Sequence, residues 1–316
     1  MSHLSHPNPE AVAAGAAIDM ALSPRPRDIG GMRVGRVLPS ARGQMIGPFI
    51  FLDRLGPTYL EPGTAEDVLP HPHIGLATVT YLFDGHMTHR DSLGSEQVIA
   101  PGAVNLMSAG RGIVHSERHD ETVKVHGGPL SGVQTWLALP REAEEGLPAF
   151  HHVSARDLPV VEEKGLRARV ILGSAFGLTA PVPLASSTFY IEAVLEAGAR
   201  LPLDTTHEER AVFIASGEVE VDGTAFQPGQ LVLIRPGLST HVQARGAARL
   251  LVLGGARMDG PRYIWWNFVS SDAERVKAAA EDWRQGRFTP IPMDHDSFIP
   301  APPDGPGRPR AQMPRG

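Results

Sequence analysis

Residues 71–117 of this 316-residue chain read HPHIGLATVTYLFDGHMTHRDSLGSEQVIAPGAVNLMSAGRGIVHSE. In this stretch, short apolar and β-branched runs such as ATVTYLFDG (77–85) and QVIAPGAVNLMSAG (97–110) alternate with glycine and proline. Runs of roughly four to eight residues with this composition are too short for helices and are typical of β-strands. The stretch therefore predicts consecutive strands of a β-sandwich or barrel.

The same pattern continues on both sides of this stretch and occurs twice along the chain. Similar runs are FIFLDRLG (49–56) and SGVQTWLALP (131–140) in the first half, and TFYIEAVLEAG (188–198), AVFIASGEVEVDG (211–223), FQPGQLVLIRPG (226–237) and ARLLVLGG (248–255) in the second. Pro101-Gly102 and Pro228-Gly229 each lead into a strand and a further turn. We therefore expect an all-β protein of two tandem β units that divide near residue 150.

This division predicts four segments along the chain. We expect a flexible N-terminal segment at 1–24, a first barrel at 25–150, a second barrel at 151–295 and a disordered tail at 296–316. The tail is expected to be disordered because most of it, APPDGPGRPRAQMPRG (301–316), is rich in proline and glycine.

One α-helix is predicted at 271–285, within SSDAERVKAAAEDWRQGRF. Ser271 followed by Glu274 three residues later has the spacing of a capping box, and Gly286 lies where a helix typically ends. Val276 and Ala280 lie on one apolar face that can pack on a sheet.

Composition excludes several classes of protein. The 29 basic and 35 acidic side chains give a net charge of −6, which argues against a nucleic-acid or anionic-membrane binder. The chain contains no cysteine, so disulfides, thiolate zinc sites and a cysteine nucleophile are excluded. We find neither a convincing signal peptide nor an apolar stretch long enough to span a membrane, and we expect a cytoplasmic protein.

Two pairs of residues in the opening stretch form a candidate metal site. His71 and His73 are two positions apart, as are His115 and Glu117, and alternate residues of a strand face the same way. On neighbouring strands, these four side chains would surround one ion. Three imidazoles and a carboxylate suit Fe(II), Mn, Ni, Cu or Zn and leave coordination positions open.

Histidine pairs are also found without a metal, where they bind carbonyl groups or cap strands. The second pair, at a separation that brings the chain back to a neighbouring strand, is what favours a metal. His207 and His241 have no such partner in the sequence, so we interpret them as structural and expect the second barrel to hold no metal. His89 is interpreted as a strand residue or as one that supports the ligands.

HPHIGLATVTYLFDG, IAPGAVNLMSAGRGIVHSE and the YIWWNFVSS segment (263–271) together resemble the pirin family of the cupin superfamily. The resemblance implies two cupin barrels packed face to face, with one metal ion, usually iron, in the N-terminal barrel. Its ligands would be His71, His73, His115 and Glu117. The sequence departs from the general cupin pattern at Ala77, which we place in the position where a glutamate usually follows HxH.

The resemblance also implies a function. Bacterial pirins are associated with quercetinase activity, so we expect a metal-dependent dioxygenase that brings a flavonol-like aromatic substrate and O2 together. Glu117 could then accept the substrate's hydroxyl proton as a catalytic base. The alternative is a pirin-type regulator that binds a protein partner, such as a transcription factor or a metabolic enzyme, with the metal as a structural element or redox sensor.

Overall fold

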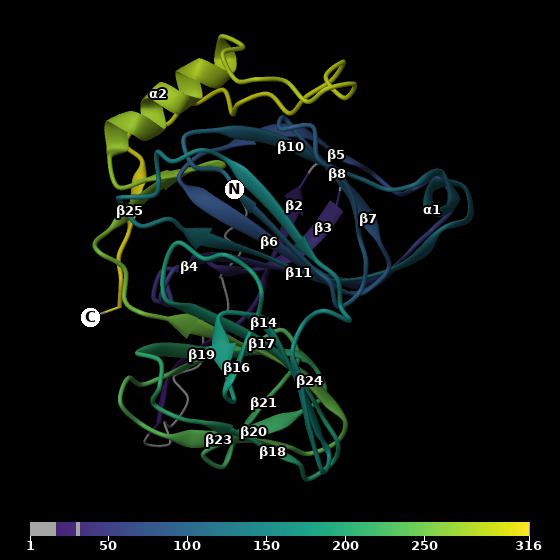
Figure 1. Cartoon of the computed structure of the whole chain (residues 1–316), viewed down its shortest axis with the longest axis vertical. Coiled ribbons are helices and arrows are strands. Elements are labelled where there is room, and N and C mark those ends of the chain that lie inside the picture. Colours follow the sequence, from purple (N-terminus) through teal and green to yellow (C-terminus); the bar gives the residue numbers. More distant parts are fainter. Residues whose placement is uncertain (1–16, 30–31, 316) are drawn as a thin grey trace, which may run out of the picture.

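The computed structural model describes residues 17–29 and 32–315 and consists of two stacked β-barrels (Figure 1). Each barrel is formed by a seven-stranded sheet and a four-stranded sheet. The seven-stranded sheet of the first barrel contains, in spatial order, β12 (Ala149–Val153), β9 (Val104–Ser108), β6 (Leu76–Asp84), β11 (Gly128–Ala138), β4 (Phe49–Leu60), β3 (Met32–Leu38) and β2 (Arg25–Ile29). Its four-stranded sheet contains β5 (Val68–His73), β10 (Ile113–Arg118), β7 (Met87–Asp91) and β8 (Glu96–Ile99).

The second barrel repeats this arrangement strand for strand. Its larger sheet contains β1 (Ile18–Leu22), β22 (Leu231–Ile234), β19 (Glu209–Ser216), β24 (Ala248–Gly255), β17 (Thr188–Leu195), β14 (Leu166–Leu172) and β13 (Val160–Glu163). Its smaller sheet contains β18 (Arg200–Leu203), β23 (Thr240–Ala244), β20 (Val219–Val221) and β21 (Thr224–Phe226). The identical strand order confirms the predicted pair of tandem β units.

The first described strand belongs to the second barrel. β1 pairs antiparallel with β22 and occupies the edge that β12 occupies in the first barrel. The expectation of a flexible segment at 1–24 is therefore wrong for residues 18–22, whereas residues 1–16 lie outside the described part of the chain. The expected boundary at 150 also falls inside β12, whose pairing with β9 keeps it in the first sheet.

The two larger sheets pack face to face. Phe49 of β4 and Tyr190 of β17 meet edge to face with ring centroids 5.2 Å apart. Both belong to one continuous apolar cluster that draws on both barrels. The Tyr81 hydroxyl crosses this layer to donate a 2.7 Å hydrogen bond to Glu192, which also pairs with Arg169. The two barrels therefore share one buried interface.

The C-terminal helix α2 (Ala273–Arg284) covers one end of the first barrel (Figure 1). Its N-cap is Asp272, whose side chain accepts a hydrogen bond from the Glu274 amide, so the expected capping role of Ser271 is wrong. Ser271 instead binds Glu144 through both its amide and its hydroxyl. Gly286 follows the helix with a φ of 66°, as expected of a residue that ends a helix.

A second, short helix, α1 (Glu121–His126), was not predicted from the sequence. Its N-cap is Asp120, whose carboxylate accepts a hydrogen bond from the Val123 amide. Neither helix in the described part of the chain is long and apolar enough to cross a membrane.

The C-terminal tail is ordered, which corrects the expectation of disorder at 296–316 for all residues but the last, which is not described. The Ile299 amide donates to the Pro70 carbonyl next to the first histidine pair, and its carbonyl accepts from Trp283 Nε1. Further along, β27 (Arg310–Gln312) pairs with β25 (Arg262–Trp265), which also pairs with β26 (Phe268–Ser270). Hydrogen bonds to distant segments therefore order a sequence that is rich in proline and glycine.

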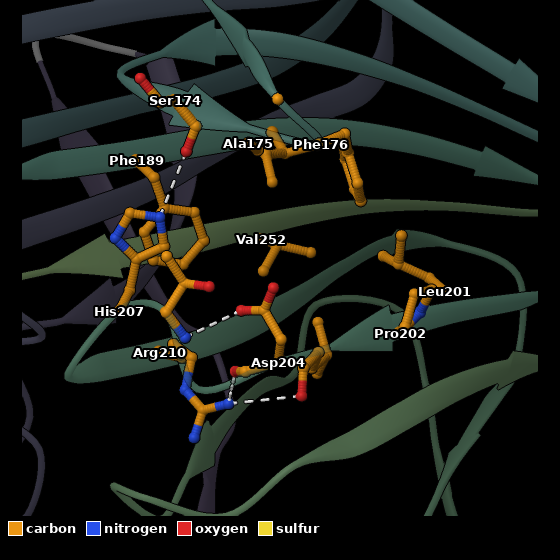
Figure 2. A pocket seen from close by; sticks show the side chains of 14 residues that line it. Ser174, Ala175, Phe176, Phe189, Leu201, Pro202, Asp204, His207, Arg210 and Val252 are labelled. Atoms are coloured by element: carbon orange, nitrogen blue, oxygen red, sulfur yellow. Dashed lines mark hydrogen bonds between the residues drawn. The ribbon is translucent and has the colours of Figure 1, made fainter.

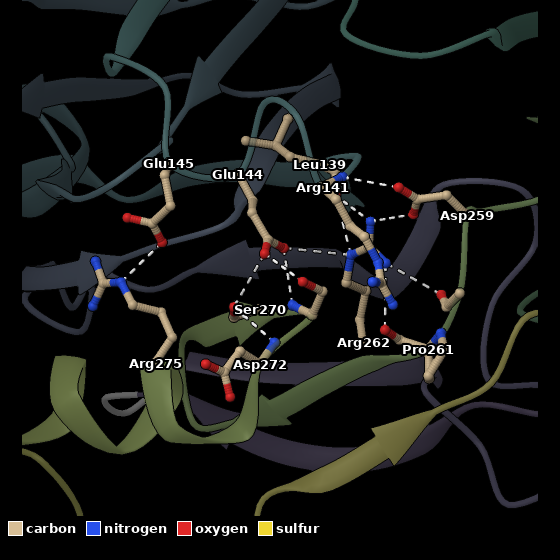
Figure 3. Close-up of polar contacts among 12 residues, drawn as sticks. Leu139, Arg141, Glu144, Glu145, Asp259, Pro261, Arg262, Ser270, Asp272 and Arg275 are labelled. Carbon is tan, nitrogen blue, oxygen red and sulfur yellow. Dashed lines mark hydrogen bonds and ion pairs between the residues drawn. The ribbon is translucent and has the colours of Figure 1, made fainter.

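A buried ionic network fixes the start of this C-terminal region (Figure 3). Arg262 is fully buried and donates to the Leu139 carbonyl through Nε and Nη2, at 3.1 and 2.8 Å. Its guanidinium also pairs with Asp259 at 2.5 Å and with Glu144 at 3.7 Å. The network ties the β25–β26 hairpin to the end of β11.

We expect Arg262→Met to lower the free energy of unfolding by about 3 kcal/mol, because it leaves the buried Glu144 carboxylate without its cation. Urea denaturation of both proteins would measure the change. Arg287→Met is the matched control, since the Arg287–Asp282 pair is exposed and should contribute less than about 1 kcal/mol. Equal effects of the two substitutions would contradict the role given to the buried network.

Candidate metal centre

Two neighbouring strands of the first barrel bring the three histidines together. β5 and β10 pair antiparallel with His71 opposite His115, and His73 lies two residues further along β5. All three side chains are buried, and one ring nitrogen of each lies within 4.8 Å of the other two. The expectation that the two sequence pairs lie on adjacent strands is confirmed.

Hydrogen bonds fix the orientation of the two β5 imidazoles. Nδ1 of His71 donates to the Leu69 carbonyl at 2.8 Å, and Nδ1 of His73 donates to the Asn267 carbonyl at 3.1 Å. Asn267 lies in the turn between β25 and β26, so the WWNF segment acts directly on this site. With Nδ1 protonated, each ring has its Nε2 lone pair free to bind a metal.

The third imidazole is oriented by a chain of side chains on β7. The Asp91 carboxylate accepts from His89 Nε2 at 2.9 Å, which leaves His89 Nδ1 as an acceptor. That nitrogen lies 3.4 Å from His115 Nδ1, which therefore donates to it. Asp91 is itself held by the amides of Leu93 and Ser95. These hydrogen bonds leave Nε2 of His115 free to bind a metal, as in the other two rings.

The three rings are uncharged at neutral pH. Burial lowers the pKa of His71 to about 4 and holds the pKa values of His73 and His115 well below the usual value for histidine. Protons therefore do not compete for the ring nitrogens near pH 7, and a metal ligand must be a neutral imidazole.

Glu117 lies two residues beyond His115 on β10, but its carboxylate is not among the donor atoms that lie within 4.8 Å of one another, which in the described part of the chain are those of the three histidines. Its carboxylate accepts from Gln134 Nε2 at 2.5 Å and from the Thr80 hydroxyl at 3.4 Å, both on the larger sheet. Burial raises the pKa of Glu117 to about 7. Gln134 and Thr80 were not singled out in the sequence, although a glutamine within the apolar run SGVQTWLALP was a signal that could have identified one of them.

The chain departs from the cupin pattern at Thr78, one residue after Ala77, where the sequence analysis placed the departure. Ala77 packs in the apolar cluster between the barrels together with Val79 and Tyr81, so it faces away from the histidines. Because side chains alternate along β6, the inward position next to it belongs to Thr78, on the same face as Thr80. The assignment of Ala77 to the glutamate position is therefore wrong, and the inward residue there is a threonine.

The donor set fits a divalent metal ion. His73 Nε2 and His115 Nε2 lie 3.1 Å apart. The hydrogen bonds described above leave each of these two nitrogens with a lone pair and without a proton. Two nitrogens bound at about 2.1 Å on adjacent octahedral positions would be about 3.0 Å apart. Two facing lone pairs repel unless a cation lies between them, so this geometry favours a metal over a purely structural histidine cluster.

Aromatic rings surround the histidines. Trp136 contacts His73 edge to face at 5.2 Å and stacks on Phe51 at 3.9 Å, while Phe150 stacks on His89 at 4.3 Å. These contacts restrict the orientation of the imidazoles and provide an apolar environment around them.

The second barrel has no imidazole at the equivalent positions. In the first barrel, His71 pairs with His115, which also pairs with Asp91. At the equivalent positions of the second barrel, Leu201 pairs with Val242, which also pairs with Val221. The inward positions of these strands all carry buried apolar side chains: Leu201, Leu203, Val219, Val221, Val242 and Ala244. His207 and His241 lie outside this set.

The duplicated barrels and the histidine triad in the first of them define a two-domain cupin. Comparison with known families specifies it further: residues 31–137 match the Pirin model and residues 190–289 match the Pirin C-terminal cupin domain. The chain belongs to the pirin family.

Individual relatives agree with this assignment. A pirin-like protein of Caulobacter vibrioides is 47% identical over 90% of this chain and 99% of its own length. The crystal structure of quercetin 2,3-dioxygenase from Acinetobacter baumannii is 34% identical, with a TM-score of 0.85 over 93% of this chain and 98% of that one. The bacterial pirin YhhW from Escherichia coli, solved in complex with nickel(II), shares the fold at 16% identity and a TM-score of 0.59, over 74% of this chain and 97% of that one.

Proposed function

We propose that the protein is a metal-dependent dioxygenase that acts on flavonol-like aromatic substrates, with Fe(II) as its metal. The observation that carries the proposal is the triad of buried, neutral imidazoles, with the buried Glu117 two residues after His115 on the same strand. The similarity to the Acinetobacter quercetin 2,3-dioxygenase supports the substrate class.

His71, His73 and His115 would hold the ion through Nε2, and Glu117 would join them as the fourth ligand. These four groups would leave coordination positions of the ion open, and the bound ion would supply the chemistry that brings O2 and the organic substrate together. The Trp136 and Phe51 rings would restrict access of water to the site and offer apolar contacts to a flat substrate.

Glu117 would also act as the base. Its carboxylate would accept the proton of the flavonol hydroxyl, which leaves an electron-rich enolate that reacts with oxygen. Gln134 and Thr80 both donate to Oε1 of Glu117, so they hold this carboxylate toward the larger sheet and leave Oε2 for the substrate.

The test is aerobic turnover of quercetin by protein loaded separately with Fe(II), Mn, Ni, Cu or Zn. The proposal predicts that the iron form consumes one O2 per flavonol, and that mass spectrometry after reaction under ¹⁸O2 finds both labelled atoms in products. Absence of turnover in every metal form would contradict it and would favour a regulatory role.

The hydrogen bonds that link Asp91, His89 and His115 lead to a further prediction. Asp91→Asn removes the charge that fixes the His89 tautomer, so we expect metal affinity to fall about 10- to 100-fold. Isothermal titration with Ni(II) would measure the affinity without any substrate. Glu96→Gln on neighbouring β8 is the matched control, because Glu96 is exposed and its ion pair is with Arg90. An unchanged affinity in Asp91→Asn would contradict this role.

A further inference from the structure

A row of polar side chains crosses the larger sheet of the first barrel. Its members pair in succession across β4, β11, β6, β9 and β12, and they are Asp53, Gln134, Thr80, Asn105 and His152. Residues paired in this way lie on the same face of a sheet. Gln134 and Thr80 both donate to Glu117 on the smaller sheet, so the row faces the interior of the barrel that holds the histidine triad.

The second barrel carries apolar side chains at the equivalent positions. Asn105 and Val232 each lie three residues after the glycine of a Pro-Gly turn, which aligns the two rows. The row of the second barrel consists of Ile191, Val252, Val212, Val232 and Ala21, all in its apolar cluster.

This apolar row continues into a cavity of about 290 Å³ at the end of the second barrel, where Figure 2 shows Val252 in the wall. The hairpin of β15 (Ser174–Ala175) and β16 (Leu178–Thr179) borders the same cavity. The duplicated fold is therefore built with an apolar row as well as with a polar one. The polar row of the first barrel is not required by the fold, which indicates that it serves the site with the three histidines.

Asn105 has a buried donor without an acceptor. The residue is 3% exposed, and its Oδ1 accepts a 2.7 Å hydrogen bond from Nδ1 of His152. This bond fixes the orientation of the amide and leaves Nδ2 as its free end. Nδ2 is buried and has no acceptor among the described residues. A buried N–H without an acceptor is costly, and an oxygen atom of a ligand would remove that cost.

The position of Asn105 determines which ligand oxygen it can meet. Gln134 and Thr80 are already engaged with Glu117, whereas Asn105 lies one strand beyond Thr80. Neighbouring strands are about 4.8 Å apart. An oxygen bound at Asn105 is therefore a different atom from the hydroxyl that Glu117 receives.

We infer that Asn105 determines the substrate specificity of the first barrel, because its Nδ2 donates to a phenolic oxygen of the flavonol other than the reacting hydroxyl. His152 is a positioning residue that holds the amide with Nδ2 free. The inference rests on the proposed function for its substrate class. It narrows that class to flavonols with further hydroxyl groups on their rings.

The test compares quercetin with 3-hydroxyflavone, which has the reacting hydroxyl and no other. Binding to the full-length, Zn(II)-loaded protein is followed by quenching of tryptophan fluorescence without O2, so that neither flavonol is consumed. We expect Asn105→Leu to weaken quercetin binding about 3- to 10-fold, the value of one neutral hydrogen bond, and to leave 3-hydroxyflavone binding unchanged. Equal weakening of both flavonols, or unchanged quercetin binding, would overturn the inference.

Two neighbouring histidines of β12 provide a second test. His152→Ala removes the hydrogen bond that orients the amide, so it should weaken binding of quercetin about 2- to 10-fold and spare 3-hydroxyflavone. His151→Ala is the matched control, because His151 is adjacent in the strand and lies on its opposite face. If Asn105→Leu fails to fold, this pair decides, and equal quercetin affinities in the two histidine variants would overturn the inference.

The same proteins separate this inference from the proposed function. Selective quercetin binding that depends on Asn105, in a protein that turns over no flavonol in any metal form, would support the inference and contradict the dioxygenase. Turnover of both flavonols by the iron form, with a ratio of kcat/KM values that Asn105→Leu leaves unchanged, would overturn the inference alone.

Discussion

His71→Ala is expected to abolish metal binding. The substitution leaves two imidazoles in a site where three converge within 4.8 Å, and a buried cation then lacks the donors that replace its hydration shell. Metal per chain, measured by inductively coupled plasma mass spectrometry after loading and desalting, should fall from one to near zero. The rise in melting temperature on metal addition should disappear as well, because only a ligand that binds the folded state stabilises it.

His207→Ala and His241→Ala are the matched controls for this result. Both residues are single histidines of the second barrel, and His207 stacks on Phe189 and contacts the Ser174 carbonyl. We expect either variant to retain full metal content. Loss of metal in these variants, or retention of metal by His71→Ala, would place the site elsewhere.

Glu117→Gln is expected to reduce turnover per bound metal by about 10²- to 10⁴-fold, the usual effect of losing a general base. Glutamine keeps the size of the side chain and one coordinating oxygen but removes the charge and most of the basicity, so part of the metal should remain. The measurement is flavonol oxidation per bound iron in the variant and in wild type.

Glu121→Gln on α1 is the control for this substitution, since the Glu121 side chain is 87% exposed. It should leave turnover per iron unchanged. Near-equal rates per iron in Glu117→Gln and wild type would show that Glu117 is not the base. The metal content of the variant would then test separately whether Glu117 is a ligand.

The sequence predicted the first barrel and the histidine triad because both depend on local periodicity. Residues two apart face the same way on a strand, so HPH and HSE each specify which side chains share a face before the partner strand is known. The register that places His71 opposite His115 then brings the two pairs together.

Features that depend on distant partners were not predictable in this way. β1 becomes a strand because β22, more than two hundred residues away, offers an open edge, and the tail is ordered by contacts with Pro70 and β25. Asp272 rather than Ser271 caps the helix, and the Ser271 hydroxyl donates to the distant Glu144. Long-range pairing therefore overrides local composition at both ends of the chain.

Alternation also explains the error at Ala77. A shift of one residue moves a side chain to the opposite face of a strand, and the cupin spacing alone does not fix which of Ala77 and Thr78 points inward. The roles of His89 and Asp91 needed the structure for a related reason, since their contact with His115 depends on the pairing of β7 with β10.

The most direct test of the account is to titrate the metal-free protein with Fe(II) under anaerobic conditions, admit O2 and measure the initial rate of quercetin oxidation at each ratio. We predict that the rate rises linearly with iron and stops rising at one iron per chain, because the first barrel alone presents a histidine triad among the described residues. A rate that stays at zero at full loading, or that continues to rise to two irons per chain, would contradict it.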